Sequence, residues 1–269
     1  MEKEQKNVLW FSEVGIKDVP LVGGKNASLG EMRNNLVAKG VPVPDGFATT
    51  APAFFSFLKE TELDKKIENI LSNLDTHNIK DLQNAGKTIR EMILQETLPA
   101  VLQEQVVNAY KKLSQNYNVE NVDVAVRSSA TAEDLPGASF AGQQETFLNI
   151  SGAENVVLAV KKCFASLFTD RAIAYRKEMG FSHMQVGLSA GVQKMVRSDV
   201  GASGVMFSCD TESGFGDVVL INASYGLGEN VVLGRVEPDQ YYVFETTLKK
   251  GFRPILEKHV GSKLIKMVT

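Results

Sequence analysis

Hydrophobic positions in the first part of the chain recur mainly at helical spacing. Two short apolar runs interrupt this pattern and predict strands at 41–49 and 122–126. Gly40 follows the first helical segment and is a candidate C-cap, and Pro99 suits a first helical turn. The periodicity predicts helices over 26–39, 52–59, 63–73, 79–95 and 99–113.

After Glu145 the pattern alternates between strand-like and helical segments. A strand at 146–150 precedes a long helical segment at 153–177. The chain should then form two lobes of the α+β class, helix-rich over about 1–185 and sheet-rich over 186–269. Four further strands are expected, at 186–196, 204–208, 218–223 and 241–244.

Composition and charge exclude several classes of partner. The 269 residues carry 29 basic and 32 acidic side chains and a net charge of −3, so no global field favours nucleic acid or an anionic membrane. No apolar run approaches membrane-spanning length, and the charged start MEKEQKN has no signal-peptide core. Cys163 and Cys209 cannot form a disulfide framework, and Cys163 falls on an apolar helical face. These features predict a soluble, cytoplasmic protein.

A stretch of small residues follows the expected strand at 122–126. The strand ends on a lone cation, Arg127, and small or hydroxylic side chains then lead to a Pro136–Gly137 turn. Small residues let a backbone approach a ligand closely, and a guanidinium matches phosphate oxygens bidentately. The pattern favours a polyphosphate site, and the alternative interpretation is a polar loop with a surface arginine.

A second stretch of small residues, Gly23–Gly24–Lys25, precedes the helix expected at 26–39. Glycines that lead into a helix N-terminus leave free N–H donors and a positive dipole end for a phosphate. Lys25 would add a point charge. The spacing is not that of a Walker A loop, and the alternative is a Gly–Gly turn with a solvated lysine.

Several blocks of the chain resemble the nucleotide-binding N-terminal region of the phosphoenolpyruvate synthase (pyruvate, water dikinase) family. The resemblance implies an ATP-grasp-like, two-lobed nucleotide-binding domain spanning 1–269, with ATP between the lobes and the C-terminal end incomplete. Pyruvate, phosphate dikinase and rifampin phosphotransferase share this architecture. The blocks are VGGKNASLGEM (22–32), VPVPDGFATT (41–50), AVRSSATAEDLPGASFAGQQETFLN (125–149), FASLFTDRAIAYR (164–176), SAGVQKMVRSD (189–199), SGVMFSCDTESGF (203–215) and GLGENVVLG (226–234).

The resemblance also implies ATP contacts at individual positions of this chain. Lys25 and Arg127 would be the catalytic groups, because they would withdraw charge from the transferring phosphates. Gly142 would let its backbone approach the triphosphate, and Thr146 could donate its hydroxyl to it.

The segment 193–196 matches the family's adenine-binding strand. Gln193 would read the adenine edge while Met195 and Val196 pack against the ring, whereas the alternative without the family is an edge strand. ATP and Mg²⁺ are the expected cofactors, but no metal ligand is assigned. Glu133 and Asp134 are interpreted as loop acids because the family's metal-binding acid lies elsewhere.

Members of this family transfer phosphoryl through a histidine on a swivelling domain to pyruvate. His77, His183 and His259 lie in none of the surroundings of that motif and are expected to be ordinary surface histidines. The family's downstream acid-and-glutamine segment is also not found before Thr269. We therefore expect a truncated piece that is inactive alone.

Two classes of function compete. The first is the ATP-binding portion of an enzyme that makes phosphoenolpyruvate, AMP and phosphate from ATP, pyruvate and water. The second is a nucleotide-binding module without turnover, and a related possibility is the ATP-binding lobe of a rifampin-type phosphotransferase.

Overall fold

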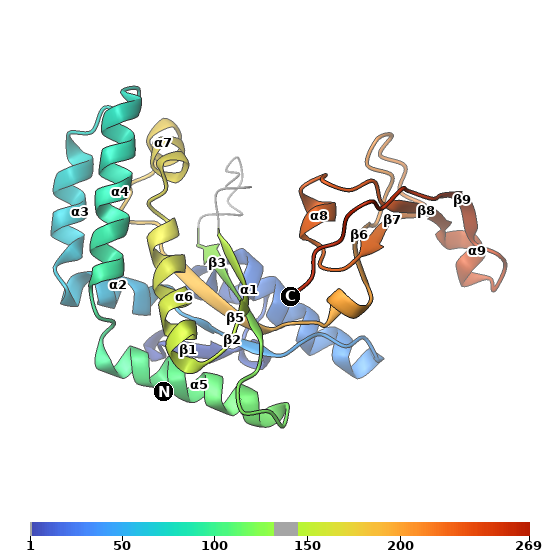
Figure 1. Cartoon of the computed structure of the whole chain (residues 1–269), viewed down its shortest axis with the longest axis horizontal. Helices are drawn as coiled ribbons and strands as arrows, with labels where there is room; N and C mark the ends of the chain where they lie inside the picture. Colours follow the sequence, from blue (N-terminus) through green and yellow to red (C-terminus); the bar gives the residue numbers. More distant parts are fainter. Residues whose placement is uncertain (1, 132–144) are drawn as a thin grey trace. The chain divides into compact units, whose positions relative to one another are not determined.

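The structure is a computed structural model that describes residues 2–131 and 145–269. It divides into two compact units, Met1–Met195 and Val196–Thr269 (Figure 1). This division lies ten residues beyond the expected one at 185/186, because the strand expected to open the second lobe pairs inside the sheet of the first unit. No helix of the described residues is long and apolar enough to cross a bilayer.

The first unit contains a five-stranded sheet with the order β1-β2-β5-β3-β4. Every neighbouring pair is antiparallel, and β5 lies at the centre between β2 and β3. Residues 188–192 of β5 are all buried, as expected for a strand with both faces covered. The strands are β1 (Val8–Trp10), β2 (Gly46–Thr49), β3 (Val124–Ala130), β4 (Thr146–Ile150) and β5 (Leu188–Lys194).

Helices cover both faces of this sheet. On one face α6 packs against Val126 of β3 and Val192 of β5 within the main hydrophobic core, and Figure 1 shows α6 crossing the sheet on the viewer's side. The opposite face receives α1, which also packs against β3 and β5, and we call it the α1 face. The helices are α1 (Val19–Leu36), α2 (Ala51–Glu60), α3 (Leu63–Ser72), α4 (Ile79–Gln95), α5 (Ala100–Asn116), α6 (Ala153–Ser166) and α7 (Asp170–Glu178).

The core of the first unit is built from the predicted apolar helix faces. Phe54 and Phe57 of α2 meet Phe164 of α6 at ring-centroid distances of 5.2 and 5.9 Å. Burying each ring contributes about 2–3 kcal/mol. Cys163 is fully buried beside them, so the prediction of a core thiol is confirmed. Desolvation raises the pKa of this thiol far above its ordinary value, which keeps it neutral and unreactive.

Two predicted elements differ from the structure for local reasons. The strand expected at 41–49 is confined to β2, because Pro42 and Pro44 lack the N–H that a strand pair requires. The helix expected at 153–177 is divided into α6 and α7, because Thr169 caps α7 by accepting a hydrogen bond from Ala172 N. Gly40 does end the first helical region, with φ of 85°, as predicted.

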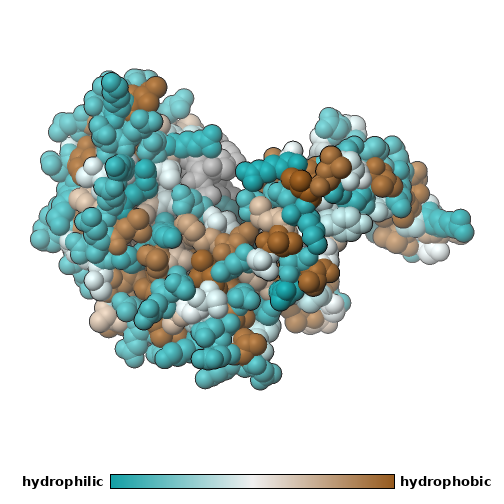
Figure 2. Space-filling view, viewed as in Figure 1, coloured by the Kyte–Doolittle hydropathy of each residue, from teal (hydrophilic) through white to brown (hydrophobic). Residues whose placement is uncertain are grey.

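The second unit is built on a four-stranded antiparallel sheet with the order β6-β7-β8-β9. Its strands are β6 (Ala202–Phe207), β7 (Val218–Tyr225), β8 (Asp239–Phe244) and β9 (Ile255–His259), and its helices are α8 (Glu229–Val232) and α9 (Glu245–Lys249). Few apolar side chains are buried here, whereas Met206 is 70% exposed and Phe252 67% exposed. Figure 2 shows hydrophobic side chains scattered among hydrophilic ones on the surface of this unit. Helices and antiparallel sheets together confirm the predicted α+β class.

Candidate functional site

Strand β3 presents one exposed side chain, Arg127, between stretches of buried residues on either side. Arg127 pairs with Thr146 on β4 and with Gly191 on β5. Residues directly opposite each other on antiparallel strands share a face and lie about 5 Å apart. The register therefore brings together two predicted phosphate contacts, Arg127 and Thr146, that are separated in sequence.

The guanidinium of Arg127 makes no hydrogen bond or ion pair with any residue of 2–131 or 145–269. Most of the other arginines of the first unit bond to protein groups, as the ion pair between Arg33 and Asp45 at 2.9 Å illustrates. An exposed cation without a protein partner can form bidentate hydrogen bonds with an incoming anion.

Gln193 lies on the same face as Arg127. It pairs with Ala125, two residues before Arg127, and side chains two residues apart on a strand point to the same side. The Gln193 amide donates one hydrogen bond to Pro44 O at 3.3 Å, which leaves its carbonyl oxygen and a second N–H for a ligand. The strand is central in the sheet, so the alternative of an edge strand is wrong.

Met195 and Val196 follow β5. Met195 is 6% exposed, and its N–H donates to Asp123 O at 2.9 Å. Val196 is 59% exposed and begins the second unit. An adenine-packing role for the two side chains stays a prediction, and only Val196 offers much free surface.

The Gly23–Gly24–Lys25 turn interrupts α1. Gly23 has φ of 73° and ψ of 163°, a conformation that other residues avoid. A Cβ on Gly23 would also lie 2.5 Å from Ser129 O, so glycine is needed for this close approach to β3. Lys25 is exposed, whereas Gly24 and Asn26 on either side are buried. The turn thus lies against the α1 face of the sheet and projects Lys25 outward.

Buried polar side chains that were not predicted from the sequence lie beneath this turn. Asn26, Ser129 and Ser189 are at most 1% exposed, and Asn26 Nδ2 donates to Ser189 Oγ at 2.9 Å. A signal was present: Ser189 and Gly191 alternate with apolar residues in β5, and a polar Asn26 opens a helix. Period-two alternation of small residues indicates a surface on which another backbone can pack.

Some predicted positions cannot be placed. Gly142, Glu133 and Asp134 lie outside the described residues. Within the described part, no group of three or more His, Cys, Asp or Glu side chains could hold a metal ion. No residue described here is therefore assigned to Mg²⁺.

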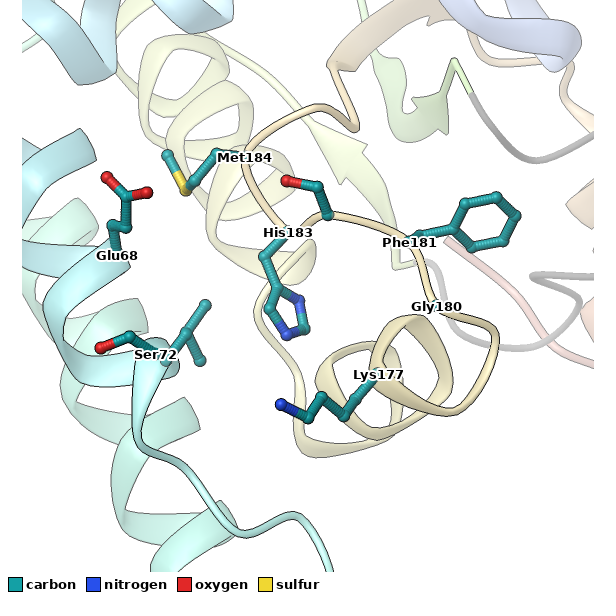
Figure 3. Close-up of a pocket in the computed structure, with 9 residues that line it drawn as sticks. Glu68, Ser72, Lys177, Gly180, Phe181, His183 and Met184 are labelled. Atoms are coloured by element: carbon teal, nitrogen blue, oxygen red, sulfur yellow. The ribbon is translucent and has the colours of Figure 1, made fainter.

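A separate open pocket of about 510 Å³ lies among α3, α7 and the loop 180–184. Figure 3 shows the His183 ring pointing into it, with Ser72 of α3 and Lys177 of α7 nearby. His183 is half-buried, so the prediction of an ordinary surface histidine is wrong for this residue. None of the pocket-lining residues is a predicted nucleotide contact.

The chemistry of His183 is set by its neighbours. Arg176 Nε donates to His183 Nδ1 at 3.1 Å, which makes Nδ1 the acceptor and places the ring proton on Nε2. Desolvation, with the charges of Arg176 and Lys177, lowers the pKa of His183 to about 4. The ring is neutral at physiological pH and has no free nitrogen lone pair with which to attack a phosphoryl group. His77 and His259 are exposed, as predicted.

Comparison with known proteins identifies the class of protein to which this chain belongs. Residues 19–269 match the family described as "Pyruvate phosphate dikinase, AMP/ATP-binding domain". The chain belongs to this family of nucleotide-binding domains.

Individual relatives make the similarity more specific. The chain is 58% identical over 268 residues to the phosphoenolpyruvate synthase of Aquifex aeolicus, covering 100% of this chain and 31% of that protein. It is 53% identical over 261 residues to the phosphoenolpyruvate synthase of Escherichia coli, covering 97% of this chain and 33% of the relative. A probable phosphoenolpyruvate synthase of Methanocaldococcus jannaschii is 50% identical over 258 residues, covering 96% of this chain and 21% of the relative. The chain thus spans about a third or less of these relatives.

Proposed function

We propose that the chain is the ATP-binding part of a phosphoenolpyruvate synthase and that ATP binds at the α1 face of the first sheet. The observation that carries the proposal is the strand register. It places Thr146 of β4 directly opposite Arg127 of β3, and it places Gln193 of β5 on the same face of the sheet, opposite Ala125. The Gly23–Lys25 turn packs on that face at Ser129. The names of the similar proteins support the same assignment.

The proposed roles follow from the chemistry of each group. Arg127 and Lys25 stabilise the negative charge of the transferring phosphates, which is the main contribution of a protein to phosphoryl transfer. The Thr146 hydroxyl donates to a phosphate oxygen, and the free Gln193 amide atoms bind the adenine edge. Met195 and Val196 pack against the adenine ring, and the Gly142 backbone approaches the triphosphate, as the family resemblance implies.

The complete reaction would also need groups that the described residues do not supply. Mg²⁺ would enter with the ATP phosphates and would offset part of their negative charge. The phosphoryl group would pass to a histidine on another domain and then to pyruvate, giving phosphoenolpyruvate, AMP and phosphate. We further propose an ATP-grasp-like arrangement, as the family resemblance implies, and a cytoplasmic location.

Calorimetric titration with Mg–ATP tests the assignment. We expect the wild-type chain to bind with detectable but weak affinity, because the proposed site has two cations and the described residues contain no cluster of three or more His, Cys, Asp or Glu side chains to hold the metal ion. Replacing both cations, by Lys25→Ala with Arg127→Ala, should weaken binding at least tenfold, since charge-assisted hydrogen bonds contribute about 1.5–3 kcal/mol each.

The control variant is Lys66→Ala, which removes one exposed charge from α3. It should leave the affinity unchanged. No heat at millimolar Mg–ATP, or equal weakening in the control, would contradict the proposed site.

A further inference from the structure

Asn26 occupies an unusual place on the inner side of the Gly23–Lys25 turn. In an uninterrupted helix its backbone N–H would donate to Val22 O, four residues earlier. Gly23 breaks the helix, and the Asn26 N–H instead faces Ser129 Oγ at 3.5 Å. The Asn26 side chain replaces the missing bond, because its Nδ2 donates to Val22 O at 3.1 Å. One side chain therefore closes the turn.

The same amide also attaches the turn to the centre of the sheet. Asn26 Nδ2 donates to Ser189 Oγ at 2.9 Å, and Ser189 Oγ donates in turn to Thr49 O at 2.5 Å. The Ser189 hydroxyl is thereby both acceptor and donor, so its one proton is committed to Thr49 and it accepts from Asn26. Buried groups that are fully paired in this way hold a fixed geometry, since any displacement leaves a buried polar atom unsatisfied.

Asn26 lies between the Gly23–Lys25 turn and the strand position beside Arg127. A Cβ on Gly191 would collide with Asn26 Oδ1, so Asn26 lies directly over Gly191. Gly191 is the cross-strand neighbour of Arg127, and Ser189 is the neighbour of Ser129. Asn26 therefore contacts the strand position beside Arg127 while its chain neighbour, Lys25, projects outward.

We propose that Asn26 is a positioning residue for the triphosphate: through Val22 and Ser189 it holds the Gly23–Lys25 turn, and with it the Lys25 ammonium, in register with Arg127. This inference rests on the proposed ATP site. Asn26 itself does not touch the nucleotide, because it is 1% exposed beneath the turn. It acts on the phosphate end of ATP and leaves the adenine end, at Gln193, unaffected.

The test compares two ligands and three variants of the chain. Asn26→Ala removes both side-chain hydrogen bonds, and Ser189→Ala removes the link to β5 but keeps the bond to Val22. Mg–ATP affinity should fall about tenfold in Asn26→Ala and less in Ser189→Ala, as expected for one or two displaced hydrogen bonds. Adenosine affinity, measured by NMR titration, should not change in either variant. Ser189→Thr, which keeps the hydroxyl, should restore Mg–ATP affinity relative to Ser189→Ala.

A matched control separates positioning from stability. Tyr110→Phe removes a buried hydroxyl that bonds Val122 O and Gly152 N, both at 2.9 Å, in a different part of the same unit. It should lower the unfolding midpoint without changing the ratio of the two affinities. If Asn26→Ala does not fold, Ser189→Ala carries the same comparison.

The outcomes distinguish the inference from the proposed function. The positioning role is overturned if wild-type protein binds Mg–ATP and the Lys25/Arg127 double variant does not, while Asn26→Ala and Ser189→Ala bind it as wild type does. It is also overturned if both ligands weaken in parallel. Failure of the wild-type chain to bind Mg–ATP overturns the proposed function and the inference with it.

Discussion

At the scale of single residues, the environment of Arg127 explains why we assign it to phosphate. It is the exposed member of a strand whose other residues are buried, and two neighbouring strands flank it. An arginine placed only for solubility gains little from such a rigid position, whereas electrostatic stabilisation of developing charge depends on it. β3 is an interior strand, and this makes the site precise because pairing with β4 and β5 fixes the backbone on both sides.

In a protein that combines this chain with the domains of the proposed synthase, Arg127→Ala should reduce phosphoryl transfer by about a hundredfold, the effect expected for one electrostatic donor. Nucleotide affinity should fall much less, because the charge is most needed as charge develops in the transition state. Steady-state kinetics and ATP titration of the same variant measure the two effects. Arg127→Lys should recover part of the rate, since it keeps the charge but loses the bidentate fork. Unchanged turnover in Arg127→Ala would make Arg127 a structural residue.

His183 should make the stability of the fold depend on pH. The pKa of His183 is about 4 in the folded chain, against an ordinary value of 6.5 in the unfolded chain. Above pH 6.5 the imidazole is therefore mainly neutral in both the folded and the unfolded chain. Between these values the unfolded chain binds a proton that the folded chain does not, and stability falls as the pH falls. Urea unfolding near pH 7.5 and near pH 5 should show a larger loss for wild type than for His183→Gln. Equal losses in the two proteins would show that His183 titrates normally.

At the scale of elements, the turn inside α1 determines how the candidate site is assembled. The helix begins at Val19, is interrupted at Gly23, and continues to Leu36. The interruption lets the second helical run begin against β3 and β5, with Asn26 buried and Lys25 exposed. Glycine at position 23 allows this close approach, because a Cβ there would lie 2.5 Å from Ser129 O.

Gly23→Ala should destabilise the first unit by about 3 kcal/mol. It combines the strain of a backbone region reserved for glycine with a collision against the Ser129 carbonyl. The matched control is Gly40→Ala, which has φ of 85° but no atom within 4 Å of the new Cβ, and should cost about 1 kcal/mol. Urea denaturation of the two variants gives the comparison. Similar losses in both would show that Gly23 does not pack closely against β3.

Much of the element content was predictable from local patterns, and the site geometry was not. Helices such as α4 and α5 show strong apolar periodicity, and their bounds fall within three residues of the prediction. Strand β1 has only three residues, Val8–Trp10, so it lacks a repeating pattern and was missed. The pairing of Arg127 with Thr146 and Gly191 depends on strand register, which is a non-local property. The family resemblance identified the candidate ATP contacts. The buried hydrogen bonds of Asn26 to Val22 and Ser189 could be recognised only in the structure.

At the scale of the whole molecule, the two units differ in how they are stabilised. The first unit has an extended aromatic and aliphatic core. In the second, the buried apolar residues of the described chain are Val218, Leu220, Leu227 and Val236. Regions with few buried apolar contacts open at lower free energy, and parts of a protein that move over a ligand are drawn from such regions. We therefore expect the first unit to be the more rigid of the two.

The chain by itself should not transfer phosphoryl to pyruvate. His183 is neutral with both ring nitrogens occupied by a bond or a proton, and His77 and His259 are exposed and lie in no pocket described here. Incubation with labelled Mg–ATP and pyruvate should yield neither phosphoenolpyruvate nor acid-labile phosphoprotein. A phosphohistidine at any of the three positions would show that the chain carries its own phosphoryl acceptor.

A crystal structure with a non-hydrolysable Mg–ATP analogue tests the central claim most directly. We predict that the triphosphate contacts the Arg127 guanidinium, the Lys25 ammonium and the Thr146 hydroxyl, with adenine beside Gln193. Binding of the analogue elsewhere, for example in the pocket lined by Lys177 and His183, with the α1 face left empty, would contradict the proposed ATP site.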